Sequence, residues 1–338
     1  MDDQVTISLP PKMYLNQSRY KGFQDCERYY GWQEIEHLVP AKPRKPLTMG
    51  TAVHRAQVEV YKGGASPEVI ATATEHAVKF WSDTMAPSGP TIALAGMEGL
   101  ETKEQKELQE GASLLRRMLP AYYKFWGEQG AIWRPLGMEL EFCVEVGEGT
   151  NVFLVGTIDN LAMYLNALWL VDTKTMHKMD MREFLKYQID IQLTAYLYGG
   201  TKQLAIQAAA EGKKVVPIRG AIIDGMVKTD PPQFHRELYT RTYQDLAEFE
   251  QEFCFKAWDI ASRHALVRRD RVAYNLYKEK MFDLGSSNWK VAFPKATNHC
   301  FRYGECSHRT LCVQDNETRR LDFVTKARDY VDVRAAQG

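Results

Sequence analysis

The chain has 338 residues, of which 45% are hydrophobic and 25% charged, a composition that is typical of a globular protein and excludes a largely disordered one. It carries 43 basic and 43 acidic residues, so a net charge of zero gives no global attraction to nucleic acid. The longest apolar run, Leu161 to Val171, is interrupted by Asn166 and is far shorter than the roughly 20 residues that span a membrane. We therefore expect no transmembrane helix and no membrane partner.

The amino terminus begins Met1-Asp2-Asp3 and lacks the basic and then apolar pattern of a secretory signal. We therefore expect a cytoplasmic protein whose thiols stay reduced. At this length, two average domains and one elaborated α/β domain are both ordinary.

The first part of the chain is predicted to be helical. A helix is expected from Ser18 to Trp32 with Cys26 in its middle. Prolines within residues 40–46 should break the pattern before a second helix that starts near Gly50, carries His54 and ends at Gly63-Gly64. Two further helices are expected, from Ser66-Pro67 to Trp81 and from about Glu101 to Gly127.

Strands follow this helical part. From Glu139 the apolar residues alternate with polar ones, as on a half-buried strand. Strands at 153–161 and 168–173 should be joined by a tight turn at Leu165-Asn166, and the second is nearly continuous in apolar residues, which favours a central position. The remaining expected elements are a helix from Arg182 to Ala209, a strand from Val216 to Val227, and a helix from Thr242 to about Lys280 with Phe253 and Trp258 on its inner face.

This order of elements predicts an α/β fold with a sheet flanked by helices, rather than two independent domains. We expect one domain over residues 1–338. It would consist of a helical part at 18–130, a sheet core at 136–240, and a second helical part at 241–312 that ends in a cysteine cluster.

Two acidic residues and a lysine are expected to converge on the sheet. Asp159 precedes Asp172-Thr173-Lys174 by twelve intervening residues. Adjacent antiparallel strands place Asp159 and Asp172 side by side, where like charge is costly unless a divalent cation lies between them, and oxygen ligands of this kind suit Mg²⁺ or Mn²⁺. Lys174 faces the same side as Asp172 and can activate water for attack on phosphorus.

Three further polar residues are candidates for the same site. Gln192 and Tyr196 lie four residues apart on the next predicted helix, where an amide and a phenol can hold a phosphate or the attacking water. The imidazole of His54 can complete a metal shell. Each residue also has a simpler interpretation, because Asp-x-Lys occurs widely by chance and buried polar side chains are common.

Taken in order, His54, Asp159, Asp172-Thr173-Lys174 and Gln192-x-x-x-Tyr196 resemble the RecB-like branch of the PD-(D/E)XK nucleases, over about Ser18 to Cys312. The resemblance implies a restriction-endonuclease-like core with a mixed sheet. It also implies that His54, Asp159, Asp172 and the main-chain carbonyl of Thr173 bind the metal, while Lys174 assists the water. Asp172 stands where many members have Glu, which the family pattern permits. Glu139 is a candidate outer carboxylate, although a surface strand residue is the simpler account.

Three cysteines, Cys300, Cys306 and Cys312, fall within thirteen residues near the C-terminus without helical periodicity. Four thiolates hold an iron-sulfur cluster or a structural zinc, and disulfides are disfavoured in a reducing compartment. The aromatic-rich segment that starts at Cys26 resembles the N-terminal cysteine segment of the iron-sulfur subset of this family, which includes the AddB nuclease domain and CRISPR-adaptation nucleases. The resemblance implies Cys26 as fourth ligand of a 4Fe-4S cluster that clamps the chain ends.

The spacing from Cys300 to Cys306 is longer than is usual in that subset. Zn²⁺, or His299 or His308 as a substitute ligand, therefore remains an alternative. Cys143 and Cys254 lie on apolar-patterned elements and are expected to be buried small hydrophobes.

Basic residues gather in the segment between Arg263 and Lys280, with Tyr274 and Tyr277 interleaved. Arg268 and Arg269 are our candidate DNA contacts in this segment. The simpler interpretation is a solvated helix face. A smaller basic cluster consists of Lys42, Arg44 and Lys45.

The resemblance implies a metal-dependent DNA nuclease, and we expect an exonuclease that acts on single-stranded or frayed ends in DNA repair or recombination. One alternative is a catalytically silent DNA-binding or assembly module. Others are an RNA nuclease, or a structure-specific endonuclease that works with a separate helicase or recombination partner. No Gly-x-x-x-x-Gly-Lys-Ser/Thr loop is present in the sequence, so any ATP-driven motor must be another chain.

Overall fold

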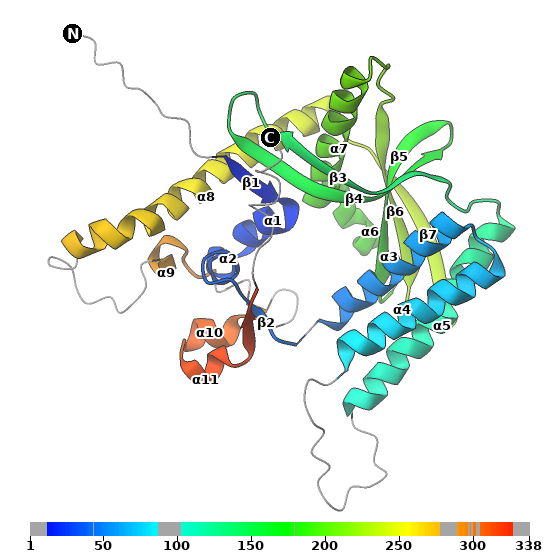
Figure 1. The fold of residues 1–338 in the computed structure, drawn as a ribbon, viewed down its shortest axis with the longest axis horizontal. Coiled ribbons are helices and arrows are strands. Elements are labelled where there is room, and N and C mark those ends of the chain that lie inside the picture. The colour runs from blue at the N-terminus through cyan, green and yellow to red at the C-terminus, as the bar shows by residue number, and fades with distance from the viewer. Residues whose placement is uncertain are drawn as a thin grey trace, which may run out of the picture. The chain divides into compact units, whose positions relative to one another are not determined.

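A computed structural model of the chain describes residues 12–42, 44–86, 103–178, 180–277, 289–296, 298, 300, 301 and 305–326. The chain forms two compact units. The sheet unit comprises residues 43–141 and 157–240, and the cysteine unit comprises residues 1–42, 142–156 and 241–338. Figure 1 shows the course of the chain through both.

The strands of the sheet unit form a mixed sheet. β4 runs antiparallel to β5, β5 parallel to β6, and β6 antiparallel to β7, while β3 pairs with β4. The predicted α/β class with a mixed sheet flanked by helices is confirmed. The strands are β3 (Pro135–Glu145), β4 (Val152–Tyr164), β5 (Ala167–Met176), β6 (Ile218–Val227) and β7 (Gln233–Tyr239).

The β4–β5 hairpin sets the register of the sheet. Its turn residues Leu165 and Asn166 have φ angles of 49° and 58°, and such positive values are what a tight two-residue hairpin turn requires. Asn160 consequently pairs with Val171. β5 lies between β4 and β6, so both the tight turn and the central position of this strand are confirmed.

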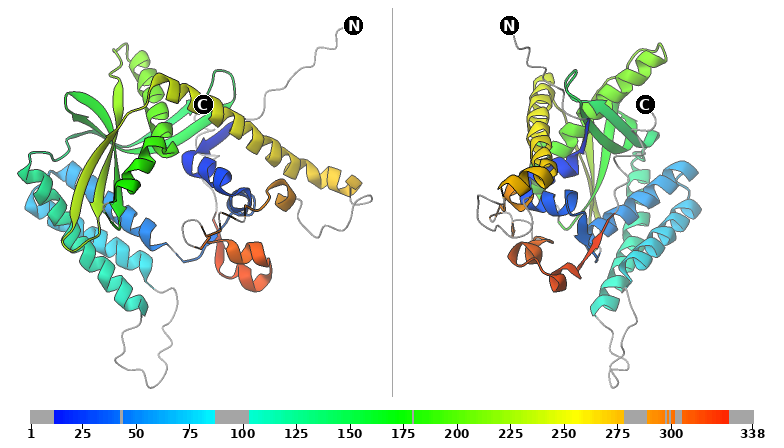
Figure 2. Two further views of the ribbon diagram at one scale, coloured as in Figure 1. Left: turned by 180° about the vertical axis from the view of Figure 1, so that it is seen from behind. Right: turned by 60° about the vertical axis from the view of Figure 1, so that its left-hand side comes forward.

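Helices cover both faces of this sheet. α3 (Lys45–Gly63), α4 (Pro67–Met85) and α5 (Lys103–Glu128) pack side by side and share an apolar core with Met226 of β6 (Figures 1 and 2). α7 (Ile191–Ala210) contacts β6 and approaches the sheet closely at Gly200, where a Cβ atom would lie 2.8 Å from Ile158. α3 starts five residues before the predicted Gly50, because Pro46 occupies its first turn, where proline is tolerated.

The single helix predicted over 182–209 is wrong. The segment is divided into α6 (Met181–Leu185), the 3-10 helix η1 (Lys186–Ile189) and α7. Asp190 ends the first part with extended backbone, and its carboxylate accepts hydrogen bonds from the main-chain amides of Gln192 and Leu193. This N-cap places Gln192 in the first turn of α7.

The cysteine unit gathers short elements from both ends of the chain around one long helix. β1 pairs in parallel with residues 152–155 of β4, and β2 pairs antiparallel with β8. Its elements are β1 (Met13–Asn16), α1 (Gln17–Asp25), α2 (Glu27–Glu34), β2 (Leu38–Pro40), α8 (Tyr243–Tyr277), α9 (Trp289–Ala292), α10 (Arg309–Val313), α11 (Glu317–Arg320) and β8 (Phe323–Thr325).

Two predictions for this unit need correction. Cys26 does not lie within a helix but between α1 and α2, with φ −162° and ψ 110°. Phe253 is buried in α8 as predicted, whereas Trp258 is 46% exposed, because five helical positions turn a side chain by about 140°. No helix in the described ranges is long and apolar enough to cross a membrane.

A buried ion pair joins α5 to the sheet within the sheet unit. Arg236 of β7 lies 3.2 Å from the fully buried carboxylate of Asp224 on β6, and its guanidinium stacks between the rings of Trp126 and Trp133. Trp133 and Tyr122 each donate a further hydrogen bond to Asp224. The Asp224 carboxylate and the Arg236 guanidinium thereby have hydrogen-bond partners, which buried charges require.

Arg236→Ala is expected to lower the free energy of unfolding by about 3–5 kcal/mol, because it leaves the Asp224 charge buried without its cation. The matched control is Arg117→Ala, since Arg117 forms an exposed ion pair with Asp230 and should contribute less than about 1 kcal/mol. Urea denaturation followed by circular dichroism measures both. Similar small losses in the two variants would contradict a structural role of the buried pair.

Candidate active site

Asp159 and Asp172 lie on neighbouring strands at the same level of the sheet. One step beyond the Asn160–Val171 pair, the β4–β5 register places the two aspartates opposite each other. Burial, opposed by the Lys174 ammonium and reinforced by the Asp159 charge, raises the pKa of Asp172 to about 6. Burial also acts on Asp159, but its hydrogen bond and attraction to His54 outweigh burial and lower its pKa. The two carboxyl groups therefore differ in pKa, although both belong to aspartates.

His54 connects Asp159 to the main chain of β5. Its Nδ1 lies 3.3 Å from Oδ2 of Asp159, and its Nε2 lies 2.9 Å from the carbonyl oxygen of Thr173. Burial lowers the pKa of His54, but Asp159 and the Thr173 carbonyl together raise it above its ordinary value. Through its two ring nitrogens, the protonated His54 thus links two of the groups predicted to bind the metal, since it can donate one N–H to each.

Lys174 stands on the other side of Asp172. Its Nζ lies 2.8 Å from Oδ2 of Asp172 and donates to Oε1 of Gln192 over 3.3 Å. Burial lowers the pKa of Lys174, but the Asp172 carboxylate more than compensates, so the lysine stays charged. Oδ1 of Asp172 is buried and has no hydrogen-bond partner in the part of the chain that the structure describes. The Asp172 carboxyl also lies within hydrogen-bond reach of Asp159, an arrangement that either a shared proton or a cation between the two groups stabilises.

Two helical elements that follow β5, η1 and α7, each contribute one phenol to the site. Burial and the Asp172 charge raise the pKa of Tyr196 to about 12, while a hydrogen bond from Gln192 opposes the rise. Gln192 thus contacts Lys174, and Tyr196 lies close enough to Asp172 to sense its charge. Tyr187 of η1, which the sequence did not indicate, is also buried, and burial and Asp172 raise its pKa against the effect of Lys174. It was missed because the break at Asp190 was not predicted.

A cavity of about 30 Å³ lies beside Asp159. Its walls include three predicted metal-binding residues and Glu139, whose φ of 48° is unusual for a strand residue. The carboxylate, carbonyl and imidazole groups around it are the donors that Mg²⁺ and Mn²⁺ accept. Its lining residues are His54, Gln57, Val58, Tyr61, Met138, Glu139, Asp159, Asn160 and Thr173.

The four predicted cluster cysteines gather within the cysteine unit. Burial raises the pKa of the Cys306 thiol, and Cys312, Cys26 and Cys300 are close enough to raise it further. Trp32 donates a hydrogen bond to Sγ of Cys312 over 3.3 Å. Within the described ranges, however, no three or more His, Cys, Asp or Glu side chains stand close enough together to hold a metal ion, here or at the aspartates.

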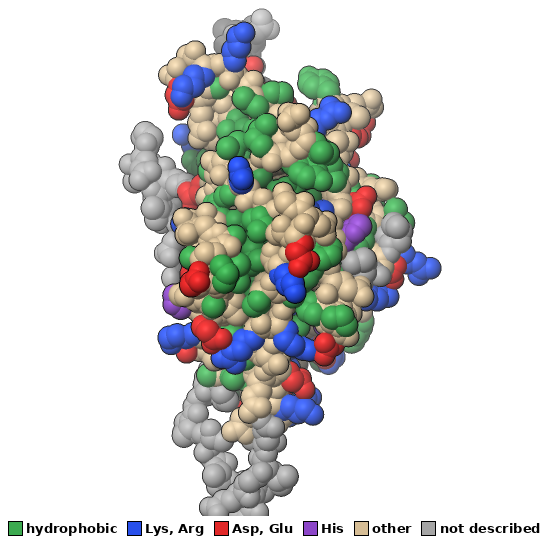
Figure 3. Space-filling view, turned by 90° about the vertical axis from the view of Figure 1, so that its right-hand side faces the viewer, with side chains coloured by type: hydrophobic (Ala, Val, Ile, Leu, Met, Phe, Trp, Pro, Cys, Tyr) green, Lys and Arg blue, Asp and Glu red, His purple; other side chains and the backbone are tan. Residues whose placement is uncertain are grey.

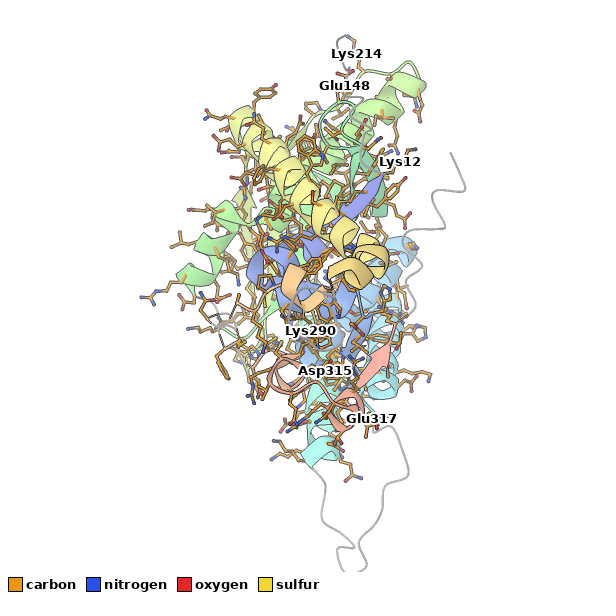
Figure 4. The ribbon with its side chains drawn as sticks, turned by 90° about the vertical axis from the view of Figure 1, so that its left-hand side faces the viewer. Lys12, Glu148, Lys214, Lys290, Asp315 and Glu317 are labelled. Carbon is orange, nitrogen blue, oxygen red and sulfur yellow. The ribbon has the colours of Figure 1, made fainter. Side chains whose placement is uncertain are left out.

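Ion pairs tie down the segment around these cysteines. Lys290 lies 2.7 Å from Asp315, which also pairs with Arg320 (Figure 4). His308 is fully buried, and its Nε2 contacts the carbonyl of Leu38 at 3.0 Å while its Nδ1 contacts Ser307. Both ring nitrogens of His308 thus lie within hydrogen-bond distance of protein groups.

The other two cysteines lie in the same unit. Cys254 is buried as predicted, and its thiol donates to the carbonyl of Val146 over 2.8 Å. Cys143 is only half-buried.

The candidate DNA contacts Arg268 and Arg269 lie in α8, but their side chains are outside the described residues, as are Lys278, Lys280 and His299. Arg263 of the same basic segment is ion-paired with Glu27 and Asp259 inside the cysteine unit. On the face drawn in Figure 3, acidic and basic side chains are interspersed, in keeping with the net charge of zero.

Comparison with known proteins identifies the family. The profile of the PD-(D/E)XK nuclease superfamily matches residues 14–312, so the chain belongs to this superfamily of nucleases, whose members generally use Mg²⁺ or Mn²⁺. No curated protein matches the sequence. A solved structure from Eubacterium rectale, named “Putative exonuclease”, is 14% identical; the match covers 74% of this chain and 82% of the other, with a TM-score of 0.43.

If Asp172 binds a cation as predicted, competition with protons should make the metal affinity of the site dependent on pH. A cation requires the ionised carboxylate, and the pKa of Asp172 is about 6, so Mn²⁺ affinity should fall about tenfold per pH unit below pH 6. Asp172→Asn should abolish binding at pH 7, whereas Asp83→Asn, at an exposed acid of α4, should leave it unchanged. Isothermal titration calorimetry from pH 5 to 8 tests this, and an affinity independent of pH would refute Asp172 as a ligand.

Proposed function

We propose that this protein is a RecB-like, metal-dependent DNA exonuclease that acts on single-stranded or frayed ends. One observation carries the proposal: Asp159, Asp172 and Lys174 converge on the sheet, with His54 and the carbonyl of Thr173 beside them. A silent DNA-binding module has no need for the buried, unpartnered carboxylate oxygen of Asp172. This feature favours chemistry over the assembly role.

Each residue of the site has a distinct task in the proposed reaction. Asp159, Asp172, His54 and the Thr173 carbonyl would hold the divalent cation, with Glu139 as an outer carboxylate. The cation, when bound, supplies Lewis-acid stabilisation of the charge that develops on the phosphorus oxygens. Lys174, held by Asp172 and Gln192, orients the attacking water, and Tyr196 contacts the phosphate from α7.

Lys174→Ala and Asp172→Ala should each reduce DNA cleavage by at least about a hundredfold, because they remove the group that orients the water and the group that holds the cation. The control is Lys79→Ala, since Lys79 forms an exposed pair with Asp83 on α4. Cleavage of end-labelled DNA with Mg²⁺ and Mn²⁺ gives the rates, and circular dichroism confirms folding. Wild-type rates in either variant would refute the site.

The exonuclease mode rests on the Gln192–Tyr196 face and on the helices that cover the sheet. A passage lined by helices admits a single-strand end more readily than a closed strand, and aromatic groups can stack on separated bases. Linear single-stranded DNA should therefore be degraded far faster than a covalently closed circle of equal length. Equal rates would show internal cleavage, as expected of the alternative structure-specific endonuclease. Arg268 and Arg269 remain candidate DNA contacts.

We also propose that Cys26, Cys300, Cys306 and Cys312 bind a 4Fe-4S cluster, which would place the protein in the iron-sulfur subset of the family. All four cysteines belong to the cysteine unit, and Cys312, Cys26 and Cys300 each act on the pKa of the Cys306 thiol, which supports this ligand set. Its first role would be structural, because Cys26 and the other three come from opposite ends of the chain. The two units would then serve one nuclease domain, and any helicase partner would be a separate chain.

Protein purified without oxygen should be brown and contain iron, and Cys26→Ala should lose colour, iron and thermal stability together. Cys254→Ala is the matched control from the same unit; it should keep the iron, because the Cys254 thiol already donates to Val146. Iron analysis and the visible spectrum decide the question. Stoichiometric zinc without iron would exclude the cluster and support the alternative metal.

A further inference from the structure

The cavity beside Asp159 extends beyond the predicted metal ligands to two buried amides. Gln57 and Asn160 are each 5% exposed and line this cavity together with His54, Asp159 and Thr173. Gln57 lies three residues after His54 on α3, so both face the same side of the helix. Asn160 follows Asp159 on β4.

Both amides have unpartnered polar atoms. Nε2 of Gln57, and both Nδ2 and Oδ1 of Asn160, form no hydrogen bond with any residue that the structure describes. Buried polar groups are almost always hydrogen-bonded, because an unpartnered one costs free energy. An apolar side chain at either position would avoid this cost. Two such groups on the wall of one cavity indicate that something polar occupies it.

The size and chemistry of the cavity favour water. A volume of about 30 Å³ exceeds the roughly 10–15 Å³ that one water needs and is too small for a nucleotide. The amide nitrogens donate hydrogen bonds and the Asn160 oxygen accepts them, so the cavity walls can both donate to water and accept from it. Asp159 and His54 line the same space, so water held there would lie directly beside the predicted cation ligands.

We propose that Gln57 and Asn160 are positioning residues that hold water in the hydration shell of the cation bound at Asp159 and His54. This inference rests on the proposed metal-dependent function. Gln57 acts from α3, beside His54, whereas Lys174 of β5 is held by Gln192 of α7. Gln57 and Asn160 thus serve cation binding, and Lys174 serves the attacking water.

The test is a comparison of metal affinity with stability in the full-length protein. In Gln57→Leu and Asn160→Leu, Mn²⁺ affinity measured by calorimetry should fall about tenfold, as for other residues that support metal ligands. The melting temperature without metal should stay equal or rise, because an unpartnered buried amide is removed. Asn160→Asp, which can still bind water, should retain wild-type affinity or exceed it.

Thr74→Val is the matched control, since Thr74 is a buried polar residue of α4 whose hydroxyl already donates to Ile70 over 2.7 Å. It should lower the melting temperature and leave Mn²⁺ affinity unchanged. Unchanged affinity in both leucine variants would overturn the inference, as would a melting temperature that falls in parallel with the affinity. If the wild type itself binds no Mn²⁺, the proposed metal-dependent function fails instead.

Discussion

The site depends on holding two aspartates together where water is largely excluded. Asp159 and Asp172 face each other because the Leu165-Asn166 turn sets the β4–β5 register, and a slip of one residue would turn one of them to the opposite face. Two like charges in such a place repel each other and are poorly solvated. His54 and Lys174, which contact the two carboxylates, offset part of that cost, while the unpartnered oxygen of Asp172 adds to it.

The groups that contact the two aspartates lie on two sides of the sheet, one facing α7 and the other facing α3. Along β5, Asp172 and Lys174 point to the α7 side, where Gln192 meets the lysine, while the Thr173 carbonyl accepts the contact from His54 of α3. The Asp190 cap fixes where α7 begins and hence where Gln192 stands. A chain with the same residues but an uninterrupted helix over 182–209 would bring a different residue to Lys174.

Much of this arrangement was predictable because it follows from short-range rules. The hairpin, the shared face of Asp172 and Lys174, and the Gln192–Tyr196 spacing need only strand and helix periodicity. Tyr187 and Asn160 were not predictable, because their positions depend on a cap and on a cavity formed by residues distant in sequence. Trp258 shows the same limit: hydrophobicity indicated burial, but the register of α8 turns it outward.

Two groups of buried polar residues in the sheet unit differ in how fully they are hydrogen-bonded. This difference separates a group that stabilises the fold from one that serves function. Around Asp224, Arg236, Tyr122 and Trp133 satisfy every charge, which is the pattern of a network that stabilises the fold. Around Asp159, an Asp172 oxygen and the Asn160 amide remain unpartnered. Tyr61 lines the cavity of this second group, and its hydroxyl lies 3.5 Å from the hydroxyl of Tyr122 in the first. The two groups are therefore neighbours. The Asp224 network meets its charges with protein groups, whereas the Asp172 oxygen and the Asn160 amide have no such partner among the described residues, which is the pattern expected where an ion or a polar ligand binds.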